Sequence, residues 1–205
     1  MRCLSNMLRP SATLAAVAAL ALAALALAAG TAGAQGASGA GTPPAGASAA
    51  GATPAASAAH FLAQFDASMS KFIALAQAMP AEKYAWSPGG GTMSVAKVYA
   101  HVAHYNYRYP SQNMKVAAPR GVSLDTLERM TDKAQIVALL KSSAEYVRQG
   151  VRQMPEAQLS QSTELYGGTV PQGSVLLQLV AHMNEHLGQS IAYARMNGVV
   201  PPWSR

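Results

Sequence analysis

Two histidines four residues apart, His182 and His186, are the residues of this chain whose types and spacing best suit chemistry. On a helix, side chains at positions i and i+4 project from one face, about one turn apart. Neutral imidazoles are common metal ligands, so the pair predicts two ligands of a divalent metal ion. A hydrogen-bonded pair of core histidines is the alternative, because short motifs of this kind also arise by chance.

A third ligand must come from elsewhere, and the remaining histidines are His60, His101 and His104. The last two lie close together in one segment of helical periodicity. The residues that flank the first pair are apolar: Val180, Met183, Leu187 and Ile191. The histidine stripe is therefore expected to face or border a bundle interior, where an unpaired imidazole would be costly. The leading hypothesis is a three-histidine metal site between two helices.

The helices that must position these residues appear as four segments with apolar residues at helical spacing: residues 60–79, 95–110, 133–154 and 174–197. The expected N-caps are Ser94, Thr131-Asp132 and Ser174, and the expected C-terminal glycine is Gly198. Residues 159–173 are polar and predict a loop or a short hairpin. Four amphipathic helices of this length predict an all-α four-helix bundle, with sites between facing helices.

Residues 1–34 have the features of a secretory signal peptide. Two arginines precede an apolar run over residues 14–29, and the small residues 32–34 form a cleavage site. The run is mostly alanine, which favours cleavage over a retained membrane anchor. We therefore expect an exported protein, periplasmic or secreted, with no stable membrane insertion. The only cysteine, Cys3, would leave with the signal peptide, which excludes thiol ligands, thiol nucleophiles and disulfides.

Residues 35–57 consist largely of Gly, Ala, Ser, Thr and Pro. This composition cannot bury enough apolar surface to offset the entropy of ordering, so it predicts a disordered linker. Residues 58–205 then form one domain of ordinary size. The formal charge of +6 falls to +4 when the two arginines of the signal peptide are removed. The remaining basic residues are scattered without runs, so no nucleic-acid partner is expected.

Several short motifs are spread over residues 59–205. They are Trp86-x-Pro88, Ser94, His101 in the sequence VYAHV, His182-x-x-x-His186 with Gly188-Gln189, and Tyr193-x-Arg195-x-Asn197-Gly198 with Pro201-Pro202. Their combination resembles the DinB-like family of metal-binding four-helix bundles. The resemblance implies an up-down-down-up bundle with a long crossover, often a homodimer, and a divalent metal held by His101, His182 and His186. His104 does not match a ligand position of the family.

The family's name does not imply DNA binding. Members such as maleylpyruvate isomerase and the bacillithiol transferases use the metal to bind and activate a low-molecular-weight thiol. Those thiols are cytosolic, whereas this chain is expected to be exported.

Three imidazoles on one divalent ion, zinc or nickel, leave at least one coordination position open, as in catalytic sites. Water bound there has its pKa lowered to about 7, and a bound substrate oxygen is polarised. These properties predict a metal-dependent enzyme that acts on an unidentified small molecule by hydrolysis or group transfer. A non-catalytic metal- or ligand-binding bundle and a stress-linked interaction protein are the alternatives.

Five further residues are expected to orient the ligands or line the pocket: His104, Tyr105, Glu185, Gln189 and Tyr193. Gln189 and Tyr193 continue the histidine stripe by three- and four-residue steps. Glu185 matches the H-x-x-E-H pattern, in which a glutamate is the general base of a zinc protease. Helical geometry, however, sets it about 60° and 100° away from the two histidines, toward the bundle edge.

Overall fold

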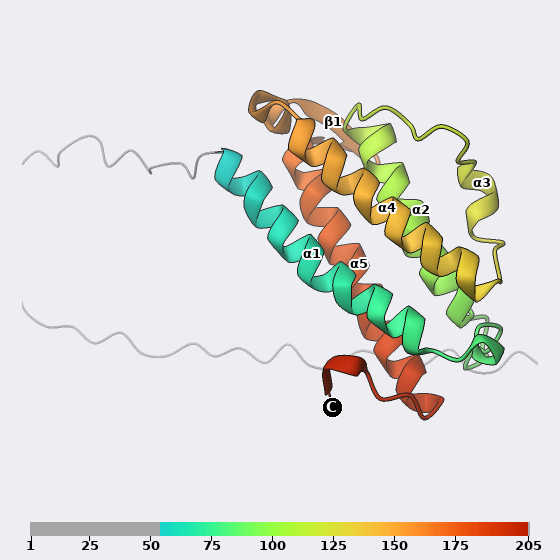
Figure 1. Ribbon diagram of the computed structural model, residues 1–205. Coiled ribbons are helices and arrows are strands. Elements are labelled where there is room, and N and C mark those ends of the chain that lie inside the picture. Colours follow the sequence, from blue (N-terminus) through green and yellow to red (C-terminus); the bar gives the residue numbers. More distant parts are fainter. Residues whose placement is uncertain (1–53, 205) are drawn as a thin grey trace, which may run out of the picture. The chain divides into compact units, whose positions relative to one another are not determined.

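The computed structural model of the protein describes residues 54–204, with side chains from residue 58 onward (Figure 1). The predicted signal peptide and all but the last four residues of the predicted linker lie outside this part. Helix α1, Pro54–Ala78, includes those four residues, so it begins before the expected residue 60. Within residues 54–204, no helix has the length and apolar character needed to cross a membrane.

Four long helices form the bundle: α1, α2 (Val95–Asn113), α4 (Lys133–Gln153) and α5 (Gln172–Met196). Each of α1 and α2 packs against both α4 and α5. Figure 1 shows that α1 and α5 run in one direction, whereas α2 and α4 run in the other. This arrangement is the up-down-down-up bundle, as predicted. The parallel pair α2 and α4 is joined by a crossover, residues 114–132, which contains the short helix α3 (Leu124–Leu127).

The apolar stripes meet in one core. Fully buried side chains come from all four long helices, among them Phe65, Phe72, Val98, Leu140, Val147, Leu179 and Met183. A hydrogen-bonded pair of polar residues also lies in the core. Asn106, only 1% exposed, donates from Nδ2 to the Ser143 hydroxyl at 3.0 Å and so links α2 to α4.

Two of the predicted N-caps are confirmed. The Ser94 hydroxyl accepts from the Lys97 amide at 3.2 Å, and Asp132 Oδ1 accepts from the Gln135 amide at 2.8 Å. Such bonds satisfy amides that the first helical turn leaves without partners. At the C-terminal end of α5, Gly198 has φ +73°, the left-handed conformation expected of it.

The predicted N-cap Ser174 is wrong, because α5 begins two residues earlier at Gln172. Pro171 precedes it in extended conformation and offers no side-chain acceptor. The Gln172 amide donates instead to the carbonyl of Gln161 at 2.9 Å, which replaces a side-chain cap. A second boundary also differs, since α2 continues past the predicted stop at Pro110 to Asn113. Pro110 has no amide hydrogen to donate, but its carbonyl accepts from the Met114 amide at 3.2 Å, which closes the last turn.

The segment between α4 and α5 forms a hairpin, one of the two structures predicted for it. After a 3-10 turn at Glu156–Ser160, strands β1 (Ser162–Leu165) and β2 (Gly168–Pro171) pair antiparallel. The two residues of its tip, Tyr166 and Gly167, have φ values of +52° and +80°. Positive φ at both central residues is the geometry of a tight hairpin turn whose twist matches its strands. Further 3-10 turns occur at Ala81–Lys83 and Pro202–Ser204.

Candidate metal centre

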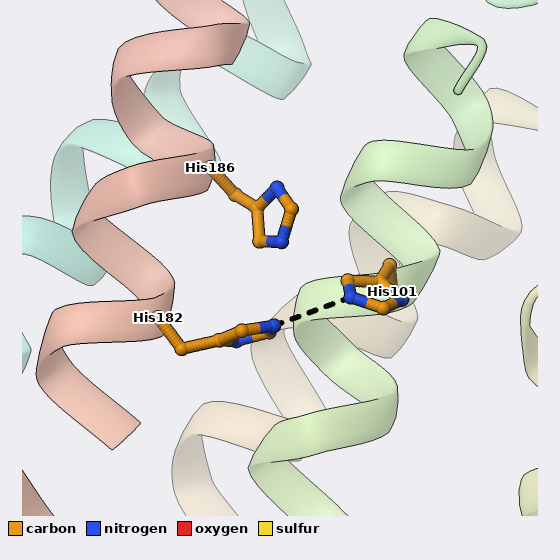
Figure 2. A group of neighbouring side chains, drawn as sticks. All are labelled: His101, His182 and His186. Atoms are coloured by element: carbon orange, nitrogen blue, oxygen red, sulfur yellow. Dashed lines mark hydrogen bonds between the residues drawn. The ribbon is translucent and has the colours of Figure 1, made fainter. Parts of the chain in front are cut away.

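The three predicted ligands meet between α2 and α5. Figure 2 shows His101 of α2 facing His182 and His186 of α5, which lie one turn apart. One ring nitrogen of each residue lies within 4.8 Å of those of the other two. The Nε2 atoms of His101 and His182 are 3.2 Å apart. The three histidines could therefore hold a metal ion.

Two of the three rings are oriented by outer partners. His101 Nδ1 donates to Glu128 Oε1 at 2.7 Å, and His186 Nδ1 donates to Gln189 Oε1 at 2.8 Å. Gln189 is held in turn, because its Nε2 donates to the Tyr193 hydroxyl at 2.9 Å. A histidine ligand usually donates its second ring N–H in this way, which fixes the ring and leaves the other nitrogen for the metal. In both rings the nitrogen left over is Nε2.

Tyrosine rings form one wall of the centre. The Tyr105 ring centroid lies 4.7 Å from that of His101 and 4.4 Å from that of His182. Tyr109, one turn further along α2, packs edge-on against His182 with centroids 6.0 Å apart. Its hydroxyl meets the hydroxyl of Tyr166 at the hairpin tip. The hairpin thus contacts the bundle next to the histidines.

The environment favours neutral imidazoles. Burial, together with the nearby rings of His186 and His101, lowers the pKa of His182 to about 3. Burial also lowers the pKa of His101, although the hydrogen bond and charge of Glu128 oppose this effect. Only a neutral imidazole has a lone pair for a metal, so these two rings are in the ligating form at neutral pH.

The donor set fits a divalent ion such as zinc. Tetrahedral zinc with bonds of about 2.0–2.1 Å to nitrogen places neighbouring ligand nitrogens about 3.3 Å apart. The 3.2 Å between His101 and His182 matches this spacing. The remaining separations, up to 4.8 Å, must shorten when an ion is bound. Three nitrogen ligands leave a fourth tetrahedral position for another group.

The other predicted site residues lie at different distances from the three histidines. Tyr105, Gln189 and Tyr193 contact the histidines or their partners, as described above. His104 packs on Tyr105, with its Nδ1 buried and without a hydrogen bond, 3.8 Å from Glu128 Oε1. Glu185 has an exposed side chain, and in residues 58–204 no described contact joins it to the three histidines. His60, on α1, is not part of the three-histidine group.

Three residues of the centre were not predicted: Glu128, Tyr109 and Tyr166. Glu128 directly follows α3 and is 27 residues from its partner His101. Its segment has no long apolar periodicity, so no pattern in the sequence connects it to the histidines. Tyr109 could have been found, because it continues the stripe of His101 and Tyr105 at steps of four residues.

Comparison with known proteins places the chain in a family. The model of the DinB superfamily matches residues 64–190. A solved DinB-like protein from Bacillus cereus ATCC 10987 aligns with a TM-score of 0.62 and 15% identity, over 69% of this chain and 93% of that one. A DinB-like protein from Bacillus subtilis aligns with a TM-score of 0.57 and 18% identity, over the same shares of 69% and 93%.

A mycothiol-dependent maleylpyruvate isomerase aligns with a TM-score of 0.51 and 16% identity, over 64% of this chain and 59% of that one. At such identities these structures establish likeness of fold alone. Among curated proteins, none matches the sequence. The extent of the family match, together with the bundle topology predicted from the motifs, shows that the chain belongs to the DinB superfamily.

Proposed function

We propose that the protein is a divalent-metal-dependent enzyme that acts on a small molecule by hydrolysis or group transfer. The convergence of three imidazoles from α2 and α5, two of them oriented by outer partners, carries this proposal. Zinc and nickel are among the ions that imidazole ligands suit. When bound, such an ion supplies Lewis-acid activation at its open position.

The chain's own residues have separate tasks in this proposal. His101, His182 and His186 hold the ion, while Glu128 and Gln189 fix two of the rings. The tyrosine wall covers one side of the centre with apolar ring surface, which limits access of water. A dry environment strengthens electrostatic interactions within the site.

A non-catalytic metal-binding bundle is the second candidate. The close packing of Tyr105 on two of the three rings favours it, because a tyrosine in that place leaves less room for a substrate. The two candidates differ in one measurable property. An enzyme must turn over a small molecule when it holds metal, and must lose that activity in a variant that cannot hold it.

We also propose that the protein works outside the cytoplasm after removal of residues 1–34, without a nucleic-acid partner, and that it forms a homodimer. Intact mass and size-exclusion chromatography with light scattering on periplasmic protein test the cleavage and the homodimer. The expected species begins at or near Gln35 and has twice the mass of one chain. A mature species that retains Cys3 would contradict export with cleavage.

Metal binding is tested by isothermal titration of zinc and nickel into the wild type and single alanine variants. Replacement of His101, His182 or His186 should abolish or severely weaken one-to-one binding, because each removes one of three ligands. His60→Ala should bind like the wild type, and His104→Ala should weaken binding at most. Unchanged binding in His186→Ala would show that the α5 pair is core packing and would overturn the proposal.

Activity is tested with the metal-loaded wild type, the chelated protein and His186→Ala on a panel of small esters, amides and thiol adducts. Thiol adducts are included because a fold relative is mycothiol-dependent. Turnover that requires both the metal and His186 supports the enzyme. Stoichiometric metal binding with no turnover of any member supports the non-catalytic bundle.

A further inference from the structure

We propose that Glu128 is a positioning residue, whose carboxylate holds His101 in the tautomer that presents Nε2 to the metal centre. This inference deepens the proposed function and rests on it. Glu128 belongs to the crossover between α2 and α4, a segment that provides none of the three ligands. The crossover would thus contribute to the metal centre through this one side chain.

The first step of the argument is the direction of the hydrogen bond. His101 Nδ1 and Glu128 Oε1 are 2.7 Å apart, the short distance typical of a bond to a carboxylate. An ionised carboxylate accepts hydrogen bonds and cannot donate them, so the proton lies on Nδ1 of His101. In a neutral ring the proton can occupy only one nitrogen. His101 Nε2 therefore carries the lone pair.

The second step is what Nε2 faces. It lies 3.2 Å from Nε2 of His182, so without metal it accepts the N–H of that ring. If the proton of His101 were on Nε2 instead, its lone pair would point at the carboxylate and away from His182 and His186. His101 could then not bind the same ion as His182 and His186.

The third step is why the Glu128 carboxylate bonds to His101 and not to the neighbouring His104. The same oxygen lies 3.8 Å from Nδ1 of His104, beyond hydrogen-bonding distance. Nδ1 of His104 is buried and has no hydrogen-bond partner. The crossover thus places Glu128 against one of two neighbouring histidines of α2, and that histidine is the one that faces α5.

The test uses the full mature protein and four forms of it: wild type, Glu128→Ala, Glu128→Gln and Asp125→Asn. Asp125 is an exposed carboxylate of the same crossover, so Asp125→Asn removes an equal charge without touching His101. Glu128 is 30% exposed, and its removal should leave the helical circular dichroism unchanged. Two readouts are measured: zinc affinity by competition titration, and the ring tautomers by long-range proton–nitrogen NMR of the metal-free protein.

Wild type should show His101 protonated on Nδ1. Glu128→Ala should lose this signature and bind zinc about 10- to 100-fold more weakly, as expected for loss of an outer partner of a ligand. Glu128→Gln should lie between them, because its amide oxygen still accepts the Nδ1 proton. Asp125→Asn should stay within about twofold of wild type, since solvent and salt screen exposed charges.

Zinc affinity unchanged in Glu128→Ala, or His101 protonated on Nε2 in the wild type, would overturn the inference. Failure of the wild type to bind either zinc or nickel would instead overturn the proposed function. The tautomer measurement needs no metal, so it decides the role of Glu128 in that case too.

Discussion

Burial keeps His182 neutral at the centre, and this makes the stability of the protein depend on pH. In the unfolded chain a histidine has a pKa of about 6.5, whereas in the folded protein that of His182 is about 3. Between these values the unfolded state binds more protons than the folded state. Folding is therefore favoured above pH 6.5 and loses stability as the pH falls toward 3.

The metal-free protein should accordingly lose stability between pH 7 and pH 4, and His182→Gln should lose less over the same range. Urea unfolding in the presence of a chelator measures both. His60→Gln is the control, because His60 is exposed on α1. A pH dependence of the His182→Gln protein equal to that of wild type would contradict the assignment of the effect to His182.

Gln189 should support His186 as Glu128 supports His101. Gln189→Ala removes the acceptor of the His186 Nδ1 proton and should weaken zinc binding by about 10-fold or more. Tyr193→Phe, which removes only the hydroxyl that holds Gln189, should have a smaller effect. Asn184→Ala is the matched control on α5, since Asn184 bonds only the Val180 carbonyl on an exposed surface. Equal affinities in Gln189→Ala and Asn184→Ala would refute the role of Gln189.

At the scale of elements, capping residues stabilise the starts of the helices. Ser94→Ala and Asp132→Ala each remove a side-chain acceptor from a helix start and should lower the free energy of unfolding by about 1 kcal/mol. Ser123→Ala should change it by less than about 0.5 kcal/mol, because Ser123 precedes α3 without a capping bond. Chemical denaturation of the three variants measures the differences. A loss in Ser123→Ala as large as in the other two would contradict the capping argument.

The elements also show what the sequence could predict. Helical periodicity and caps predicted all four long helices. The spacing of His182 and His186 predicted the two ligands that lie on one helix. His101 followed from the family motifs. Glu128 could not be predicted, since its place depends on the path of a crossover without periodicity. The start of α5 was missed because a backbone bond to Gln161, at the base of the hairpin, replaces the side-chain cap.

At the scale of the molecule, a bound ion would tie together parts of the chain that are far apart in sequence. His101 and His182 are 81 residues apart, and both must be in place for the ion to bind. A ligand that binds only the folded state stabilises it by about 2.7 kcal/mol at a free concentration 100 times its Kd.

Zinc should therefore raise the Tm of the wild type, and a chelator should reverse the rise. His182→Ala should show no zinc-dependent rise at the same concentrations. Differential scanning calorimetry over a series of zinc concentrations is the measurement. A Tm of the wild type that is independent of zinc would show that the folded chain does not bind it preferentially.

The buried amide of Asn106 has a consequence for the precision of the centre. Helices packed only through apolar side chains can slide past one another with little change in contact area. A slide of one turn moves a helix by about 5.4 Å, which is more than the 4.8 Å that encloses the three ligand atoms. The bond from Asn106 to Ser143 breaks in such a slide, and the buried Asn106 amide loses its oxygen acceptor. The polar pair thus favours one alignment of α2 against α4, and in that alignment His101 of α2 faces the two histidines of α5.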